Sequence, residues 1–428
     1  MAGNESNNFS RIRQKEIYSA GASGKRPVVP ISFNDLEVAA KGALTPEAFA
    51  YIAGGAGLET TMKANRDAFA SVSIVPRMLR DVSQRDTSVE LFGHKLPSPF
   101  LLAPIGVLEL AHPEADLAVA KAAAAEQIPM IFSNQASCSM EDCSTVMADA
   151  PRWFQLYWST SNDLVESFVR RAEASGCSAI VVTLDTTLLG WRPRDLSLAY
   201  LPFLKGMGIA QYTSDPVFNK QVEAMPDPGS DEDKPDVTFS AIKTLLQQAR
   251  KHPGGTLANI KSKRSLKAVR LFIESYSRPS LTWQDLGFLR ELTDLPILLK
   301  GILHPADALK AMSLGVNGLV VSNHGGRQVD GAIASLKALP DVVAAAGGHI
   351  PVLFDSGIRG GADMFKAIAM GADAVLLGRP YVYGLGLAGQ AGVREVIRNL
   401  KADFELTMGL AGCSSLKNIR EECVSYSF

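Results

Sequence analysis

Short apolar runs that end in polar or glycine residues recur along most of the chain. They cover residues 99–106, 129–136, 152–158, 179–186, 296–302, 318–326, 351–357 and 374–380. Most of each run is apolar without strict alternation, which is typical of parallel strands buried on both faces. Stretches with helical periodicity separate most of them, at residues 113–126, 162–175, 305–314 and 362–370. The pattern therefore predicts eight parallel strands connected by helices.

Eight strand–helix repeats favour a (β/α)8 barrel, the TIM-barrel fold, over a doubly wound open sheet. An open sheet would usually carry a glycine-rich turn after its first strand, and no such turn follows residues 99–106. In barrels the active site forms at the carboxyl ends of the strands. The polar residues that follow the eight runs are therefore the candidates for chemistry.

Two segments lie outside the eight repeats. Residues 1–98 are predicted to form an extension of short helices and a hairpin that packs on the barrel of residues 99–428, with residues 51–56 as a loop at its mouth. A long insertion, about residues 190–279, precedes the fourth helix, expected at 281–292. Its position at the catalytic face predicts a lid, and a disordered tether is the alternative. Residues 223–236, with six acidic side chains, are expected to be disordered.

Composition limits the possible functions. The 428 residues are 46% hydrophobic and 20% charged, as in soluble enzymes, and the net charge of −1 implies no general attraction to nucleic acid or membranes. No apolar run reaches the ~18 residues of a membrane-spanning helix, and the amino terminus lacks the apolar core of a secretory signal. Five cysteines without a CxxC pair indicate reduced thiols rather than disulfides or a metal site. We therefore expect a cytoplasmic protein.

The sixth run leads into Ser-Asn-His324-Gly-Gly-Arg327-Gln-Val-Asp330, the densest group of reactive side chains. His324 can act as a base near neutral pH, and Arg327 can hold a carboxylate through two parallel hydrogen bonds. The paired glycines permit positive φ or a close approach to a ligand. Asp185, at the end of the fourth strand, can orient His324 and stabilise its cation. The alternative is a structural ion-pair network.

The loops after the seventh and eighth strands contain Arg359 and Arg379, with glycines beside both. In TIM barrels these loops commonly bind phosphate, which arginines and free backbone N–H groups hold well. The alternative is that both arginines pair with neighbouring acids. Lys300 ends the fifth strand and can form a Schiff base, as in an aldolase, or hold negative charge on a cofactor. Tyr51 and Tyr157 can donate hydrogen bonds to a substrate.

These segments resemble the FMN-dependent α-hydroxy-acid oxidase and dehydrogenase family. The matching pieces are LYW at 156–158, TLDT at 183–186, LLKGI at 298–302, SNHGGRQVD at 322–330, DSGIRGG at 355–361 and LLGRP at 376–380. The resemblance runs from about Tyr51 through the last strand, interrupted by the insertion. It implies a homo-oligomeric flavoprotein, tetramer or octamer, that oxidises a small 2-hydroxy acid.

The resemblance also implies roles by position. His324 would be the base that starts oxidation of the α-carbon, and Asp185 its partner. Arg327 and Tyr51 would bind the substrate carboxylate, with Tyr157 near the hydroxyl.

A second substrate arginine is implied at Arg192, with Arg194 as the alternative. FMN would be held by Pro104, Ile105, Gly106, Ser133, Gln155, Thr183, Lys300, Ser322, Asp355, Gly357, Arg359, Gly378 and Arg379. The sequence departs from the family pattern at Gln135, where many members have an aromatic residue, and at Gly106, where glycolate and lactate oxidases usually have alanine. Gln135 implies a substrate pocket of altered shape, and Gly106 implies added space near the flavin for oxygen or a larger side chain.

The insertion resembles that of lactate 2-monooxygenases, in residues 190–204 and 206–218, as does APIGV at 103–107. In such an enzyme lactate reduces FMN, oxygen yields hydrogen peroxide, and retained pyruvate is decarboxylated to acetate, carbon dioxide and water. A long lid gives a physical reason for that retention. We therefore predict oxidation of an L-2-hydroxy acid by O2, with lactate favoured and decarboxylation coupled to it.

Several alternatives stay open at the level of sequence. One is a simple oxidase that releases hydrogen peroxide. Another is a membrane-associated dehydrogenase that docks through residues 243–278, where nine lysines and arginines face one acid, Glu274. A lysine-dependent aldolase using Lys300, and a flavin-binding protein without catalysis, are the others.

Overall fold

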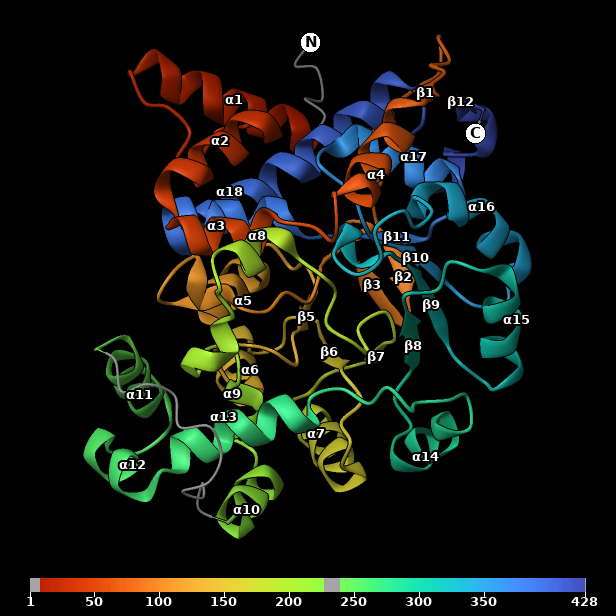
Figure 1. Cartoon of the computed structure of the whole chain (residues 1–428). Helices are drawn as coiled ribbons and strands as arrows, with labels where there is room; N and C mark the ends of the chain where they lie inside the picture. Colours follow the sequence, from red (N-terminus) through yellow and green to blue (C-terminus); the bar gives the residue numbers. More distant parts are fainter. Residues whose placement is uncertain (1–7, 227–238, 428) are drawn as a thin grey trace.

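The computed structural model describes residues 8–226 and 239–427. Eight parallel strands close into a barrel in the order β10-β11-β4-β5-β6-β7-β8-β9 (Figure 1). They are β4 (Phe100–Leu102), β5 (Met130–Phe132), β6 (Arg152–Leu156), β7 (Ile180–Thr183), β8 (Ile297–Lys300), β9 (Gly318–Val321), β10 (Val352–Phe354) and β11 (Ala374–Leu377). Each predicted run contains one of these strands, so the predicted TIM barrel is confirmed.

Side chains from all eight strands fill the inside of the barrel, as the packed interior of this fold requires. The strands contribute Leu101, Ile131, Trp153, Val181, Leu298, Val320, Leu353 and Leu376 to one buried cluster. The predicted hairpin, β2 (Val89–Leu91) and β3 (His94–Leu96), joins this cluster through Leu91 and Leu96. In its turn, Phe92 packs edge-on against Trp153 with 5.6 Å between ring centres. The hairpin therefore extends the apolar interior of the barrel.

The outer faces of the strands pack against helices that follow them along the chain. These are α5 (Ala115–Ala125), α6 (Met140–Met147), α7 (Asn162–Ala174), α14 (Asp285–Leu292), α15 (Pro305–Ser313), α16 (Ser335–Ala346), α17 (Gly361–Ala369) and α18 (Arg379–Leu410). The fourth barrel helix, α14, begins four residues later than predicted. None of the helices within the described ranges is long and apolar enough to cross a bilayer.

The amino-terminal extension packs on the long last helix, α18 (Figure 1). It comprises α1 (Phe9–Ala22), α2 (Phe33–Ala43), α3 (Pro46–Ala53), α4 (Thr60–Ala70) and β1 (Val72–Ile74), which pairs with the carboxy-terminal strand β12 (Val424–Tyr426). The expectation of a loop over residues 51–56 was wrong in its first half. Tyr51 lies in the last turn of α3, because Pro46 and the capping Thr45 start a helix just before it.

The insertion folds into short helices rather than a tether. They are α8 (Pro193–Ser197), the 3-10 turn η2 (Pro202–Lys205), α9 (Ala210–Thr213), α10 (Pro216–Ala224), α11 (Phe239–Lys251), α12 (Thr256–Ser262) and α13 (Arg264–Ser275). Tyr212 is fully buried and donates a hydrogen bond to Asn134, while Asp215, also buried, pairs with Arg171 at 2.9 Å. Buried polar contacts of this kind fix the segment to the barrel. Most of the expected disordered stretch, residues 227–238, lies outside the described residues.

Candidate active site

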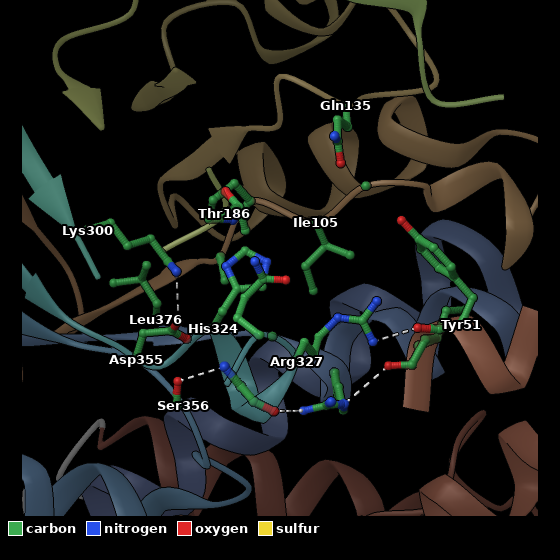
Figure 2. A pocket seen from close by; sticks show the side chains of 18 of the residues that line it. Tyr51, Ile105, Gln135, Thr186, Lys300, His324, Arg327, Asp355, Ser356 and Leu376 are labelled. Atoms are coloured by element: carbon green, nitrogen blue, oxygen red, sulfur yellow. Dashed lines mark hydrogen bonds and ion pairs between the residues drawn. The ribbon is translucent and has the colours of Figure 1, made fainter. Parts of the chain in front are cut away.

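A cavity lies at the carboxyl ends of the barrel strands and receives residues from all eight (Figure 2). The residues at or just beyond the strand ends are Ile105, Gln135, Tyr157, Thr186, Lys300, His324, Asp355 and Gly378. The closed barrel directs the ends of eight separate strands to one place, so segments distant in sequence meet here.

His324 follows β9 in a turn that the paired glycines make possible. Its own φ is 57°, and Gly325 and Gly326 have φ of 64° and 75°. A Cβ on Gly326 would lie 2.6 Å from the backbone nitrogen of Met62, so a larger residue does not fit there. The backbone N–H of His324 donates to the Ser322 hydroxyl at 3.0 Å. The turn therefore aims the imidazole into the cavity.

Asp185 holds the imidazole of His324 from the end of β7, with 2.8 Å between Oδ1 and Nδ1. Burial opposes the negative charge of Asp185, but Lys300 and His324 outweigh that effect and keep the pKa of the carboxyl below its usual value. An ionised Asp185 requires Nδ1 to be the donor, which leaves Nε2 to accept a proton. Burial lowers the pKa of His324, an effect that Asp185 partly offsets, so the ring is a neutral base at neutral pH.

Lys300 is the centre of a second buried group beside this pair. Its Nζ lies 3.0 Å from the Ser322 hydroxyl, 3.3 Å from Asp355 and 3.5 Å from Asp185. Burial opposes its charge, but the two carboxylates outweigh burial and raise the pKa of the ammonium. A Schiff-base lysine needs a lowered pKa, so this environment argues against the aldolase alternative.

Arg192, which is buried, and Arg327, which is partly buried, form a clamp around Tyr51. Arg327 donates to the carbonyl oxygens of Tyr51 and Gly54 at 2.6 and 2.8 Å, and its guanidinium lies 5.2 Å from the Tyr51 ring centre. Burial and the nearby charges of Arg192 and Arg379 lower its pKa to about 9. A guanidinium buried among other cations fits a carboxylate ligand. Burial also raises the pKa of the Tyr51 hydroxyl, which stays protonated as a donor.

The two substrate-arginine candidates separate clearly. Arg192 lines the cavity, is largely buried and donates to Gln328 at 3.1 Å. Arg194 pairs with Glu59 at 2.5 Å and is well exposed, so it turns away. Tyr157 lines the cavity as expected, and burial together with Asp185 raises its pKa to about 12.

Arg359 and Arg379 lie in the loops after β10 and β11, and neither forms an ion pair within the described residues. Arg379 donates to the carbonyls of Ile52, Gly54 and Gly325. The Nε of Arg359 is buried and has no hydrogen-bond partner in the part of the chain that the structure describes, and burial with the nearby Arg379 lowers the pKa of Arg359 to about 9. The alternative of pairing with neighbouring acids is therefore wrong. An incompletely bonded, buried guanidinium fits an anion that is part of a ligand.

Several predicted residues lie beneath or beside the cavity rather than on its wall. Gln155 donates to Thr183 at 3.1 Å and accepts from Ser133 at 3.3 Å, all three buried. Ser322 lies among Lys300, Asp355 and the His324 turn. Asp330 accepts hydrogen bonds from Leu58, Thr60 and Thr61, so the carboxylate of the SNHGGRQVD segment caps α4.

The remaining flavin candidates, Pro104, Ile105, Gly106, Gly357 and Gly378, line the cavity. Sequence reasoning missed Phe203 and Tyr276 of the insertion, which line it as well. Ser356, which accepts from the Gly325 N–H at 2.9 Å, was also missed. Ser356 stands between two predicted residues and was open to the same argument. No pattern in the insertion distinguishes Phe203 and Tyr276 from its other aromatic residues.

Fold and site together define a TIM-barrel protein whose cavity combines a histidine–aspartate pair, two arginines beside Tyr51 and two further arginines after β10 and β11. Residues 40–426 match the FMN-dependent dehydrogenase family, and the chain belongs to it. The L-lactate oxidase of Lysinibacillus sphaericus is 41% identical, over 91% of this chain and 92% of that protein. An FMN-dependent α-hydroxy acid dehydrogenase of Schizosaccharomyces pombe is 41% identical, over 94% and 93%. The crystal structure of a mandelate oxidase, 36% identical, superposes with a TM-score of 0.74 over 94% and 99%.

The protein is therefore an FMN-dependent oxidoreductase that acts on 2-hydroxy acids, as the resemblance implied. The site fits the cofactor at Arg359, whose orphaned Nε and lowered pKa fit a phosphate group. Lys300, which also lines the cavity, supplies a fixed positive charge.

Proposed function

We propose that the protein oxidises a short L-2-hydroxy acid, with lactate preferred, to the 2-keto acid and uses O2 as the electron acceptor. The observation that carries the proposal is the shared cavity of the Arg192–Arg327 clamp and the His324–Asp185 pair. A substrate carboxylate held by the clamp has its α-carbon near the base. The names of the lactate oxidase relatives support the substrate.

Each residue of the site has a separate role in the proposed reaction. Arg192, Arg327 and Tyr51 bind the carboxylate and orient the substrate, while Tyr157 donates to its hydroxyl. His324 removes a proton through Nε2, and Asp185 stabilises the imidazolium that results. When bound, FMN supplies the two-electron acceptor that O2 regenerates. The part of the cavity wall next to the bound FMN would be held in place by Lys300, Ser322 and Asp355.

The size of the substrate follows from the wall of the cavity. Phe203 and Tyr276, both large, project from the insertion into the lining, and Leu188 and Leu189, just before the insertion, line the cavity as well. These side chains occupy space that a bulky substrate group would need, which favours the methyl group of lactate. The aryl groups of mandelates, which are present in solved structures of mandelate oxidase, are expected to fit less well.

We also propose that pyruvate stays in the closed site and reacts there with hydrogen peroxide, giving acetate, carbon dioxide and water. The insertion supports this outcome, since its buried contacts fix it over the barrel mouth. A simple oxidase that releases pyruvate and peroxide is the second candidate, and the names of the lactate oxidase relatives favour it. A cytoplasmic location and a tetramer or octamer remain predictions from the sequence.

The test is to mix the yellow enzyme anaerobically with L-lactate, L-mandelate and glycolate and to follow flavin bleaching. Lactate should bleach it fastest, and His324→Gln should keep its flavin yet bleach ~10²–10⁴-fold more slowly. Admitting air should then give acetate without free peroxide. Equal amounts of pyruvate and peroxide, without acetate, would identify the simple oxidase, and no bleaching by any of the three would refute the proposal.

A further inference from the structure

Glu109 occupies a corner where three segments of the chain meet. It lies in the short turn η1 (Leu108–Leu110), just after the Pro104–Gly106 loop at the cavity, and only 8% of its side chain is exposed. Its backbone N–H donates to the Ser137 hydroxyl at 3.1 Å, in the loop that follows β5. Burial of a carboxylate is costly unless it is paired and hydrogen-bonded, so its partners matter.

Both carboxylate oxygens of Glu109 bind the insertion. Oε1 accepts from the backbone N–H of Gly208 at 3.1 Å, and Oε2 forms an ion pair with Lys251 at the end of α11. Residues 201–208, here called the lid tip, carry Phe203 into the lining of the cavity. Glu109 therefore connects the Pro104–Gly106 loop to the lid tip, the part of the insertion that reaches the cavity.

Close packing confirms that the lid tip lies directly on this corner. A Cβ on Gly208 would come within 2.3 Å of the Val107 side chain and 3.2 Å of the Gln135 carbonyl. Next to it, Ala210 donates its N–H to the Ala136 carbonyl at 3.1 Å.

The outer side of the lid tip rests on α11, where Gln248 donates to the Leu204 carbonyl at 2.7 Å. Lys251 belongs to the same helix, so its ion pair with Glu109 draws α11 and the lid tip together toward the barrel. Removal of the Lys251 charge would leave Glu109 buried with one neutral hydrogen bond from the insertion. The contact between Glu109 and Lys251 is thus well placed to control movement of the lid tip away from the cavity.

We propose that Glu109 is a positioning residue that fastens the lid tip over the site, so that the keto-acid product leaves only when its bonds to Gly208 and Lys251 break. The identity of that product rests on the proposed function. The fastening itself does not, because it is a contact of the resting protein.

The experiment compares Glu109→Ala, Glu109→Gln, Lys251→Met and the double variant Glu109→Gln with Lys251→Met, all as holoenzymes. The matched control is Lys243→Met, a lysine on the exposed face of the same helix. Hydrogen exchange of residues 201–210 reports the lid tip, and displacement of bound pyruvate in a stopped-flow instrument reports release.

Lys251→Met and Glu109→Gln should each speed pyruvate release about two- to fivefold, as a partly exposed ion pair allows. The double variant should add little, because both changes remove one interaction. Glu109→Ala, which also loses the Gly208 hydrogen bond, should have the largest effect. Exchange of residues 201–210 should rise in the same order, with Lys243→Met unchanged.

Exchange and release in Lys251→Met and Glu109→Gln that match Lys243→Met would overturn the proposal. Fully additive effects in the double variant would do so as well, since they would mean that the two residues act separately. If lactate fails to bleach the wild-type flavin, the proposed function fails, while hydrogen exchange still tests the fastening. The two failures are therefore distinguishable.

Discussion

Replacement of Asp185 by asparagine tests the base on which the proposed chemistry depends. The variant keeps the size of the side chain but removes the charge that lies 2.8 Å from Nδ1 of His324. The asparagine amide can also turn and donate to Nδ1, which selects the wrong tautomer. We expect flavin binding to survive and the rate of flavin reduction by the hydroxy acid to fall.

The size of the loss follows from the geometry. With charge centres about 4 Å apart and an effective dielectric constant of about 20, imidazolium and carboxylate attract by about 4 kcal/mol. Because about 1.4 kcal/mol corresponds to a tenfold change in rate, the loss is roughly a thousandfold. The ground state of His324 is neutral, so this attraction develops as the proton arrives and acts on the rate of the proton transfer.

Anaerobic stopped-flow spectroscopy measures this rate per bound flavin. The matched control is Asp355→Asn, since Asp355 lies 3.3 Å from Lys300 and, within the described residues, forms no hydrogen bond or ion pair with the imidazole. If the loss came only from leaving Lys300 short of negative charge, both variants would slow reduction equally. An Asp185→Asn rate within about threefold of wild type, or equal losses in both variants, would refute the role of Asp185.

Two other predictions address the proton and the phosphate. Because burial lowers the pKa of His324, the neutral base persists below the usual histidine range, so the reduction rate should stay flat from about pH 8 to below about pH 6.5 and then fall. A decline that begins above about pH 7 in stopped-flow measurements would contradict this sign. Arg359→Met should weaken FMN about 10- to 100-fold in fluorescence titrations, the worth of a charge-assisted bond, and leave riboflavin affinity unchanged. Equal weakening of both flavins would show that Arg359 supports the fold and not the phosphate.

The barrel could be predicted because its information is local and repeated. A parallel strand buried on both faces is apolar along its length, so each of the eight runs could be recognised from its own residues alone. The polar residue after each strand then became a candidate, since closure of the sheet directs all those ends to one face. For His324, Lys300 and Arg379 this argument needed only their position after a strand.

What could not be predicted depends on contacts between distant segments. Phe203 reaches the cavity because Glu109, Asn134 and Arg171 hold the insertion by bonds that span tens of residues. Asp330 looked like part of the chemistry beside His324, yet it caps α4, because the start of that helix is brought against it by the fold. The sequence shows which charged residues lie near a motif. Only their contacts in the folded protein show whether each charge is already paired.

The partners of the buried cations support the same distinction inside the site. Lys300 has two carboxylates within 3.5 Å and a raised pKa, so the protein itself balances its charge. Arg327 and Arg359 are partly buried, bond mainly to carbonyl oxygens and have pKa values lowered to about 9. Burial of an unbalanced guanidinium costs stability, which a bound anion restores. We therefore expect substrate carboxylate and cofactor phosphate to stabilise the protein by binding at these two arginines, whereas Lys300 is a cation whether or not they are bound.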